Sequence, residues 1–202
     1  GTNSFSGCTA LMKVDFADRG ENGESLVLGN NVFAECSELV EINFEKSNAK
    51  TVGQTTFGNC ISLKKIKLPD TLESSGVGMF YGCKSLKEVD LGTKITQLLG
   101  YTWTGTEKGF FEDCTNLTTI TIPSQVTVLE HNAFKGCTEL QSVQFAENSQ
   151  LTHIGGYSYE ITGHVFEDCN KLTEITIPTS VTNIGTNSFS GCTALMKVDF
   201  AD

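Results

Sequence analysis

LTEITIPTSVTNIGTNSFSGC, residues 172–192, is the stretch that decides the fold of this chain. Ile175 and Ile177 alternate with polar residues, which is the period of a short strand with one buried face. Pro178 follows at once and ends the strand, because proline cannot donate to a ladder of backbone hydrogen bonds. A second apolar segment over residues 181–184 leads to the next Phe and Cys. The stretch therefore predicts one turn of a coil with an apolar inner side.

The same frame, Phe-x-x-Cys-x-x-Leu-x-x-(Ile/Val)-x-(Phe/Leu/Ile), recurs along the whole chain, and we call each instance a rung. One such coil cannot bury its apolar side alone, so stacked rungs are predicted to share a continuous core and a parallel sheet. Successive cysteines lie 28, 24, 23, 31, 23, 32 and 23 residues apart, so the basic unit has 23 residues and some units carry insertions. The eight rungs begin at Phe5, Phe33, Phe57, Phe80, Phe111, Phe134, Phe166 and Phe189.

The order of apolar residues, proline, glycine, Phe and Cys over residues 172–192 resembles the BspA-type (Treponema-type) leucine-rich repeats, and the resemblance covers the whole chain. It implies one domain over residues 1–202, a right-handed solenoid of about eight repeats. A parallel β-sheet is expected on its concave face, and short irregular or 3-10 segments on its convex side. The resemblance also implies an extracellular or cell-surface protein that acts in adhesion. It brings no catalytic residue and no cofactor.

The array repeats at a longer period as well. Residues 1–18 reappear without a change as residues 185–202, which is a period of 184 residues. An uncapped solenoid exposes strand backbone and apolar side chains at each end. We therefore interpret the chain as part of a longer array, and we expect end-to-end self-association as one possible contact.

Composition excludes some partners. The net charge is −10, from 24 acidic and 14 basic residues, and Arg19 is the only arginine. Nucleic acids and anionic membrane surfaces both select a concentrated positive charge, so neither is expected as a partner. No stretch of this chain has the roughly 18 uninterrupted apolar residues that a membrane span requires.

The eight cysteines occupy one position of the repeat, so their side chains are predicted to point into the core rather than toward one another. Cysteine packs well as a small buried apolar side chain, and we expect free thiols and no disulfide. No paired C-x-x-C or C-x-x-H spacing predicts a metal site. The acidic residues 18–24 lack the spacing of a calcium loop, which favours a solvated turn.

Two columns of the predicted strands should face solvent, at two and four residues after each repeat leucine. The first column alternates in charge over the first four rungs, as expected of a cross-strand ladder of opposite charges. Rungs five and six instead carry a patch rich in hydroxyl and amide groups, which could bind an extended peptide or a glycan or could be inert. This patch consists of Thr119, Thr121, Ser142 and Gln144.

Two insertions of about eight and nine residues precede rungs five and seven, and both contain a Gly-Tyr-(Thr/Ser)-(Trp/Tyr) pattern. Extra loops on a solenoid gather on one face and often bind ligands. Two rungs span roughly 10 Å, which could admit a sugar ring or a side chain between aromatic walls. The alternative is that the rings cover the apolar convex surface. The aromatic residues are Tyr101, Trp103, Tyr157 and Tyr159.

No catalytic arrangement is found. The three histidines form no HExxH, Ser-His or Cys-His motif, and the carboxylates of Glu112/Asp113 and Glu167/Asp168 are sequence neighbours whose side chains should diverge. The sequence therefore predicts a non-enzymatic extracellular binding or adhesion module with a protein partner on a cell or matrix surface. The alternatives are a carbohydrate-binding module that uses the aromatic insertions and a structural spacer.

Overall fold

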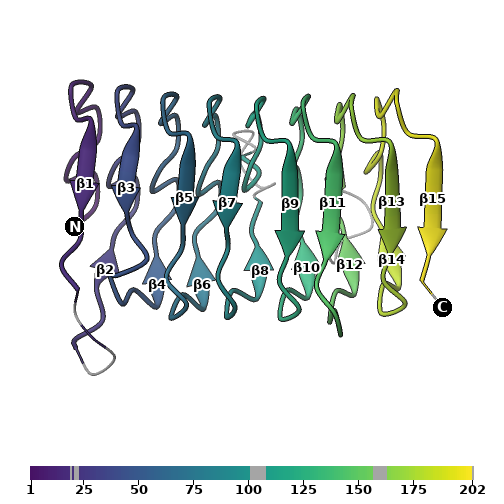
Figure 1. Ribbon diagram of the computed structural model, residues 1–202, viewed down its shortest axis with the longest axis horizontal. Coiled ribbons are helices and arrows are strands. Elements are labelled where there is room, and N and C mark those ends of the chain that lie inside the picture. The colour runs from purple at the N-terminus through teal and green to yellow at the C-terminus, as the bar shows by residue number, and fades with distance from the viewer. Residues whose placement is uncertain (19, 21–22, 101–107, 157–162, 202) are drawn as a thin grey trace.

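The computed structural model describes residues 1–18, 20, 23–100, 108–156 and 163–201. The described residues form one elongated coil of short parallel strands, and none of them lies in a helix (Figure 1). The coil has eight front strands with seven back strands between them, so it closes about seven full turns. The predicted solenoid is therefore confirmed.

The front strands carry the alternating Ile or Val of each rung and lie side by side along the molecule (Figure 1). They end where the sequence predicted, because β9 stops before Pro123 and β13 stops before Pro178. The front strands are β1 (Lys13–Asp15), β3 (Glu41–Asn43), β5 (Lys65–Lys67), β7 (Glu88–Asp90), β9 (Thr119–Ile122), β11 (Ser142–Phe145), β13 (Glu174–Ile177) and β15 (Lys197–Phe200).

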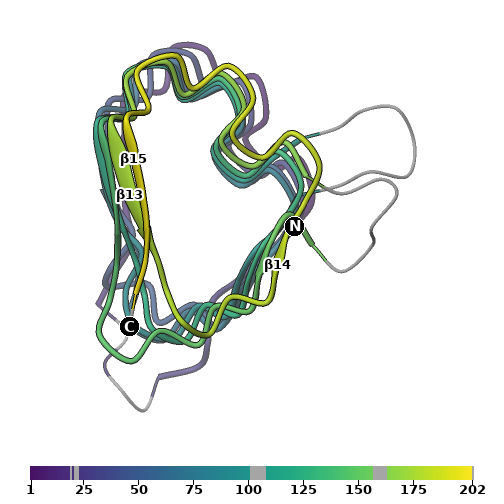
Figure 2. The ribbon, with the colours of Figure 1, turned by 90° about the vertical axis from the view of Figure 1, so that its right-hand side faces the viewer.

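The back strands have two residues each and lie across the coil from the front strands (Figure 2). This side is more regular than the irregular or 3-10 segments that we predicted, since the second apolar segment of each rung pairs with its neighbours. The back strands are β2 (Val27–Leu28), β4 (Thr51–Val52), β6 (Ser74–Ser75), β8 (Gln97–Leu98), β10 (Val128–Leu129), β12 (His153–Ile154) and β14 (Asn183–Ile184).

The parallel ladders are interrupted at defined places. Front strands are hydrogen-bonded in four pairs, β1–β3, β5–β7, β9–β11 and β13–β15. Back strands form two sheets, β2–β4–β6 and β8–β10–β12–β14. Two gaps fall on either side of the corner where Phe80 stacks on Phe111: β6 is not hydrogen-bonded to β8 in the back ladder, and β7 is not hydrogen-bonded to β9 in the front ladder. The corner of the coil that contains the repeat Phe and Cys is continuous between these gaps.

The repeat phenylalanines stack in one column through the interior. Phe33 and Phe57 have ring centroids 5.8 Å apart and an interplanar angle of 4°. At the other end of the column, Phe134 and Phe166 stack at 5.2 Å and 9°. Buried Phe, Cys, Leu and Ile/Val positions from successive rungs belong to one contiguous apolar core. The predicted single stacked interior is confirmed.

The repeat cysteines have a role that the sequence did not predict. Each thiol from rung two to rung eight donates a hydrogen bond to the carbonyl oxygen of the repeat Phe one rung earlier, at Sγ–O distances of 3.0–3.3 Å. The Phe57 carbonyl, for example, accepts the Cys60 N–H at 3.3 Å and the Cys83 thiol at 3.0 Å. The backbone N–H satisfies one lone pair of this oxygen and the thiol satisfies the other, so the carbonyl is fully hydrogen-bonded. All eight cysteines are free thiols.

Thiol reactivity tests this packing. Burial raises the pKa of Cys83 to about 12 and that of Cys192 to about 11, whereas Cys8 is exposed. Because the thiolate is the reactive form, a disulfide reagent at about pH 8 should modify Cys8 rapidly and Cys192 slowly. The other six thiols should react only as the chain unfolds. The same titration in denaturant, with all eight thiols accessible, is the control, and rapid reaction of several buried thiols in the folded chain would contradict the structure.

Candidate functional site

The front face carries cross-strand pairs of opposite charge over rungs one to four, as predicted. Lys13 Nζ lies 3.0 Å from Glu41 Oε1 on the adjacent strand, and Lys67 Nζ lies 3.4 Å from Asp90 Oδ2. These side chains are about half exposed, so each pair contributes little stability on its own. Their effect is to neutralise the face over rungs one to four.

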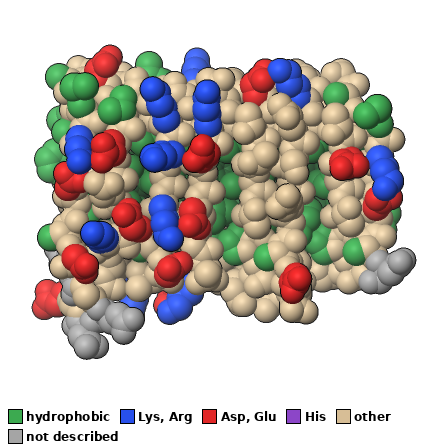
Figure 3. All heavy atoms as spheres, in the orientation of Figure 1, with side chains coloured by type: hydrophobic (Ala, Val, Ile, Leu, Met, Phe, Trp, Pro, Cys, Tyr) green, Lys and Arg blue, Asp and Glu red, His purple; other side chains and the backbone are tan. Residues whose placement is uncertain are grey.

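An uncharged window follows these pairs at β9 and β11. Thr119 faces Ser142 across the two strands, and Thr121 faces Gln144. Thr119, Thr121 and Gln144 are exposed and Ser142 is half-buried. Figure 3 shows this area without Lys, Arg, Asp or Glu side chains between charged regions, and with apolar side chains visible below the surface. The structure therefore brings the four predicted residues together.

The window lies between two open depressions of the front face, and each of its strands lines one of them. A depression of 930 Å³ extends from β3 across β5 and β7 to β9, and Thr119 and Thr121 form its wall. A second depression of 820 Å³ begins at β11, with Ser142 and Gln144 in its lining, and reaches Lys197 on β15. A partner segment that crosses the strands could therefore enter from either depression and pass over hydroxyl and amide groups.

The aromatic residues of the insertions, Tyr101, Trp103, Tyr157 and Tyr159, lie outside the described residues. The described ends of both insertions follow back strands of one sheet, β8 and β12, with β10 between them. Figure 2 places this sheet across the coil from the front strands. As the order of the sequence predicted, the insertions leave the coil on the side opposite the uncharged window.

Glycines anchor both insertions to the rung that follows. A Cβ at Gly100 would lie 1.8 Å from the His131 carbonyl oxygen, and a Cβ at Gly109 would lie 1.8 Å from that of Asn132. A Cβ at Gly163 would lie 1.9 Å from the Thr186 carbonyl oxygen. The backbone at the roots of the insertions thus passes so near the next rung that no side chain fits. The insertions can leave the coil without disturbing its stacking.

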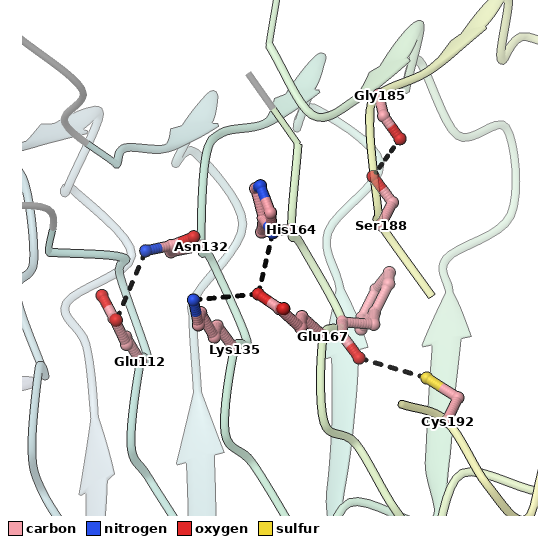
Figure 4. A network of polar contacts seen from close by, with 9 residues as sticks. Glu112, Asn132, Lys135, His164, Glu167, Gly185, Ser188 and Cys192 are labelled. Atoms are coloured by element: carbon pink, nitrogen blue, oxygen red, sulfur yellow. Dashed lines mark hydrogen bonds and ion pairs between the residues drawn. The ribbon is translucent and has the colours of Figure 1, made fainter. Parts of the chain in front are cut away.

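A polar network connects rungs five, six and seven beside these anchors (Figure 4). Glu167 Oε2 accepts contacts from Lys135 Nζ at 2.9 Å and from His164 Nδ1 at 2.8 Å. Glu112 accepts the Gly109 N–H at 2.7 Å and a hydrogen bond from Asn132 Nδ2 at 3.3 Å. We did not predict this network. Comparison of the residues one position after each repeat Phe would have found it, since rungs five to seven place Glu112, Lys135 and Glu167 in one column.

The surroundings of the two glutamates shift their pKa values in opposite directions. Burial raises the pKa of Glu112, and the hydrogen bonds from Gly109 and Asn132 offset this only in part. Burial acts in the same direction on Glu167, but the hydrogen bonds from Lys135 and His164 outweigh it and hold its pKa below the ordinary value. The folded structure therefore disfavours the charged form of Glu112 and favours the charged form of Glu167.

Asp113 and Asp168 follow the two glutamates in sequence, and their carboxylates lie against the backbone of the next rung. This agrees with the predicted divergence of the paired carboxylates. Asp113 and Asp168 both have φ of +61°, in the left-handed region that Asp and Asn tolerate better than most residues. Each carboxylate lies against a glycine of the next rung: a Cβ at Gly136 would lie 2.6 Å from Asp113 Oδ1, and a Cβ at Gly191 would lie 2.3 Å from Asp168 Oδ1. This pairing of Asp with Gly explains why Gly follows Asp at this position in successive rungs.

The described residues contain no group of three or more His, Cys, Asp or Glu side chains arranged to hold a metal ion. Nor do they include a helix with the length and apolarity needed to cross a membrane. The His131 and His164 rings pack edge to face with centroids 5.4 Å apart.

Comparison with known proteins identifies the repeat. The model of the BspA type leucine rich repeat region matches residues 1–106 and 104–202, with six copies. The solved leucine-rich repeat protein of T. pallidum is similar over 85% of this chain and 69% of its own, with 24% identity and a TM-score of 0.66. One from Bacteroides ovatus covers 100% of this chain at 19% identity and a TM-score of 0.52, and this chain spans 63% of it. No curated protein matches the sequence.

Two substitutions in the network are expected to shift stability in opposite directions at neutral pH. Glu112→Gln should raise the free energy of unfolding because it removes a half-buried charge. Asn132 Oδ1, which has no hydrogen-bond partner among the described residues, can accept from the new amide after a flip of the Asn132 side chain. Glu167→Gln should lower the free energy of unfolding by about 1 kcal/mol, because it weakens two charge-assisted hydrogen bonds.

The pH dependence of these effects follows from the two pKa shifts. A lowered folded-state pKa gives Glu167 a stabilising contribution that is present above 4.5 and is lost as the pH falls through its folded pKa. A raised folded-state pKa makes charged Glu112 destabilising at neutral pH, and this cost disappears as the pH falls through that pKa toward 4.5. Thermal unfolding followed by circular dichroism at several pH values measures both, and shifts of the same sign at neutral pH would contradict the assignment.

Proposed function

Because this chain belongs to the BspA-type leucine-rich repeat family, we propose that it is a non-enzymatic binding module whose front face contacts a protein partner. Leucine-rich repeat proteins generally bind proteins, and the family and fold are typically non-enzymatic. We further propose that the module acts in adhesion, outside the cell or on its surface. The fold supports a role through surface contacts, since its described residues present a long array of strands with open depressions on the front face.

The front-face proposal rests on the uncharged window between the two depressions. Charged side chains lose hydration when a partner covers them, whereas exposed hydroxyl and amide groups can exchange water for a partner's backbone at smaller cost. Ile120 and Val143 lie just below the window and are nearly buried, so a partner gains some apolar contact there as well. An extended segment that lies across β9 and β11 fits this surface.

Charge introduced into the window should abolish protein binding. Thr121→Arg with Gln144→Arg adds two like charges at directly facing positions. We expect a loss of at least about tenfold in affinity for cells or immobilised matrix proteins, measured by biolayer interferometry, because a partner must then cover unpaired charges. Thr51→Arg, at an exposed position of the back strand β4, is the matched control. Equal binding by the unmodified chain, the double variant and the Thr51→Arg control would refute a front-face site.

A second proposal concerns carbohydrate and rests on where the insertions are rooted. Both leave the same back sheet, two rungs apart, from positions where glycines fix the backbone against the next rung. Tyr101, Trp103, Tyr157 and Tyr159 would then contact a sugar on the side opposite the window. Planar aromatic rings provide apolar contact for a sugar face, and two such loops could hold one ring between them.

The insertion site is tested separately from the window. Trp103→Ala with Tyr159→Ala should remove binding on a glycan array and should leave protein binding by the front face unchanged. The Thr121→Arg, Gln144→Arg protein should show the reverse, so each variant serves as the control for the other. A blank glycan array with the unmodified chain would exclude the carbohydrate proposal. If neither ligand class binds, the chain acts as a structural spacer.

A further inference from the structure

The basic residues of this acidic chain are concentrated in one part of the coil. Residues 46–94 hold eight of the 14 basic residues and four of the 24 acidic ones, so their net charge is +4. The rest of the chain, with six basic and 20 acidic residues, has a net charge of −14. The coil around rungs three and four is therefore a positive segment of a negative molecule.

Three of these lysines lie at the edge of the front face where the strands begin. Lys64 and Lys87 come one residue after the repeat Leu of rungs three and four, directly before β5 and β7. Lys84 comes one residue after the repeat Cys of rung four. All three are exposed, and Figure 3 shows basic side chains side by side above β5 and β7. We call these three residues the lysine patch.

The lysine patch has no acidic partner within the chain. The Lys87 N–H donates to the Lys64 carbonyl at 2.9 Å, so these two lysines are direct neighbours on adjacent rungs. No ion pair joins Lys64, Lys84 or Lys87 to a described residue. Like charges at facing positions of adjacent strands destabilise a sheet. On the strands of the same two rungs, by contrast, Lys67 pairs with Asp90.

Other rungs show that the fold does not require a lysine at these positions. The position after the repeat Leu holds Val40 in rung two and Thr118, Gln141 and Thr173 in rungs five to seven. Rungs three and four thus carry a repulsive pair where neutral side chains form the same coil. When a sequence breaks a local rule without a structural gain, a functional cause is expected.

Exposed apolar side chains lie next to the lysine patch. Val40 is 37% exposed and Ile61 is 43% exposed. Among the described residues between 30 and 180, these are the two large apolar side chains that are exposed to this degree. Val40 precedes Lys64 in the column after the repeat Leu, and Ile61 precedes Lys84 in the column after the repeat Cys. The surface is therefore apolar toward rung two and basic toward rung four.

The larger front depression opens at this surface. Val40 and Lys64 belong to its lining, as do the nearly buried Ile42 and Ile66. At its other end the depression reaches the strand β9 of the uncharged window. A segment seated in the depression can therefore contact the lysine patch and the window at the same time.

We propose that the lysine patch, together with Val40 and Ile61, binds a segment of the protein partner in which apolar residues adjoin a run of Asp or Glu. The inference deepens the front-face proposal by naming the chemistry of the partner, and it rests on that proposal. Acidic side chains of the partner neutralise Lys64 and Lys87, while an apolar side chain covers Val40 and Ile61. Charge complementarity of this kind speeds association and selects the partner.

The apolar half of the surface favours a peptide over a sulfated polysaccharide. A sulfated polysaccharide offers charge to the lysines but has no apolar side chain to cover Val40 and Ile61. A long polyanion would also extend over neighbouring rungs, where the negative charge of the rest of the chain repels it. A short acidic segment meets only the positive part of the coil.

A fluorescent peptide of two leucines followed by four glutamates tests the ligand chemistry, with fluorescence anisotropy as the measurement on the full chain. Binding should weaken as the salt concentration rises, because exposed charges are screened. The same peptide with glutamine in place of glutamate should bind at least about tenfold more weakly. Equal binding of the two peptides, or binding of heparin but of neither peptide, would overturn the proposal.

Lys64→Glu separates binding from folding. It places opposite charges next to each other on rungs three and four, so the free chain should unfold at a higher temperature, measured by circular dichroism. The same change should weaken binding of the glutamate peptide by about tenfold, because it replaces attraction by repulsion. Lys50→Glu, directly before the back strand β4, is the matched charge control and should bind the peptide like the unmodified chain. Equal loss of binding in both variants would exclude the lysine patch.

Val40→Ser with Ile61→Ser tests the apolar half of the surface. Both side chains are exposed, so the fold should be retained, and binding of the peptide should weaken by about fivefold. A peptide with glycine in place of leucine should bind the double variant and the unmodified chain equally. If the double variant binds the leucine peptide as tightly as the unmodified chain, the apolar contact is wrong.

The window variant distinguishes this inference from the function that it extends. Thr121→Arg with Gln144→Arg should lose binding to cells or matrix proteins and should still bind the glutamate peptide, because added arginines do not repel acidic side chains. Loss of cell or matrix binding, with no peptide binding by the unmodified chain, would reject the acidic segment and leave the front-face site in place. Peptide binding that depends on Lys64, with cell binding unchanged in the window variant, would instead refute the front-face function.

Discussion

The carbonyl oxygen of the repeat Phe is the constraint on which the rest of this structure depends. It points along the axis of the coil and accepts two donors, the backbone N–H of the Cys in its own rung and the thiol of the Cys in the next. Cys83 is fully buried and supplies the second donor from a small side chain. The hydrogen bond fixes the register of each rung on the last, and this register aligns the strand columns, the glycine roots of the insertions and the network around Glu167.

Much of the fold could be predicted because its determinants repeat. Phe, Cys, Leu and Ile/Val recur at fixed spacing, so burial of one implies burial of all, and the prolines mark where β9 and β13 end. The thiol hydrogen bond was not predicted, since spacing alone does not show which backbone carbonyl lacks a donor. The regular back strands were missed for a related reason: two apolar residues are too short a pattern to distinguish a strand from a turn.

The candidate site was predicted in part. The uncharged window follows from in-register columns, and the structure places its four residues together. The contrast between Glu112 and Glu167 could not be deduced from the Phe-Glu-Asp-Cys motif that both share. It depends on the neighbouring rung, which offers Asn132 to one and Lys135 to the other. In a solenoid, identical motifs acquire different electrostatics from whatever is stacked beside them.

The two neighbouring gaps in the ladders, between β6 and β8 on the back and between β7 and β9 on the front, have a mechanical consequence. Neither the front nor the back ladder crosses from β7 to β9 or from β6 to β8, so the Phe and Cys corner is the continuous hydrogen-bonded spine there. Shear and tension along the axis concentrate where fewest backbone bonds resist them. We expect the coil to bend more readily at this place than at the other breaks of the front ladder, where the back sheet continues.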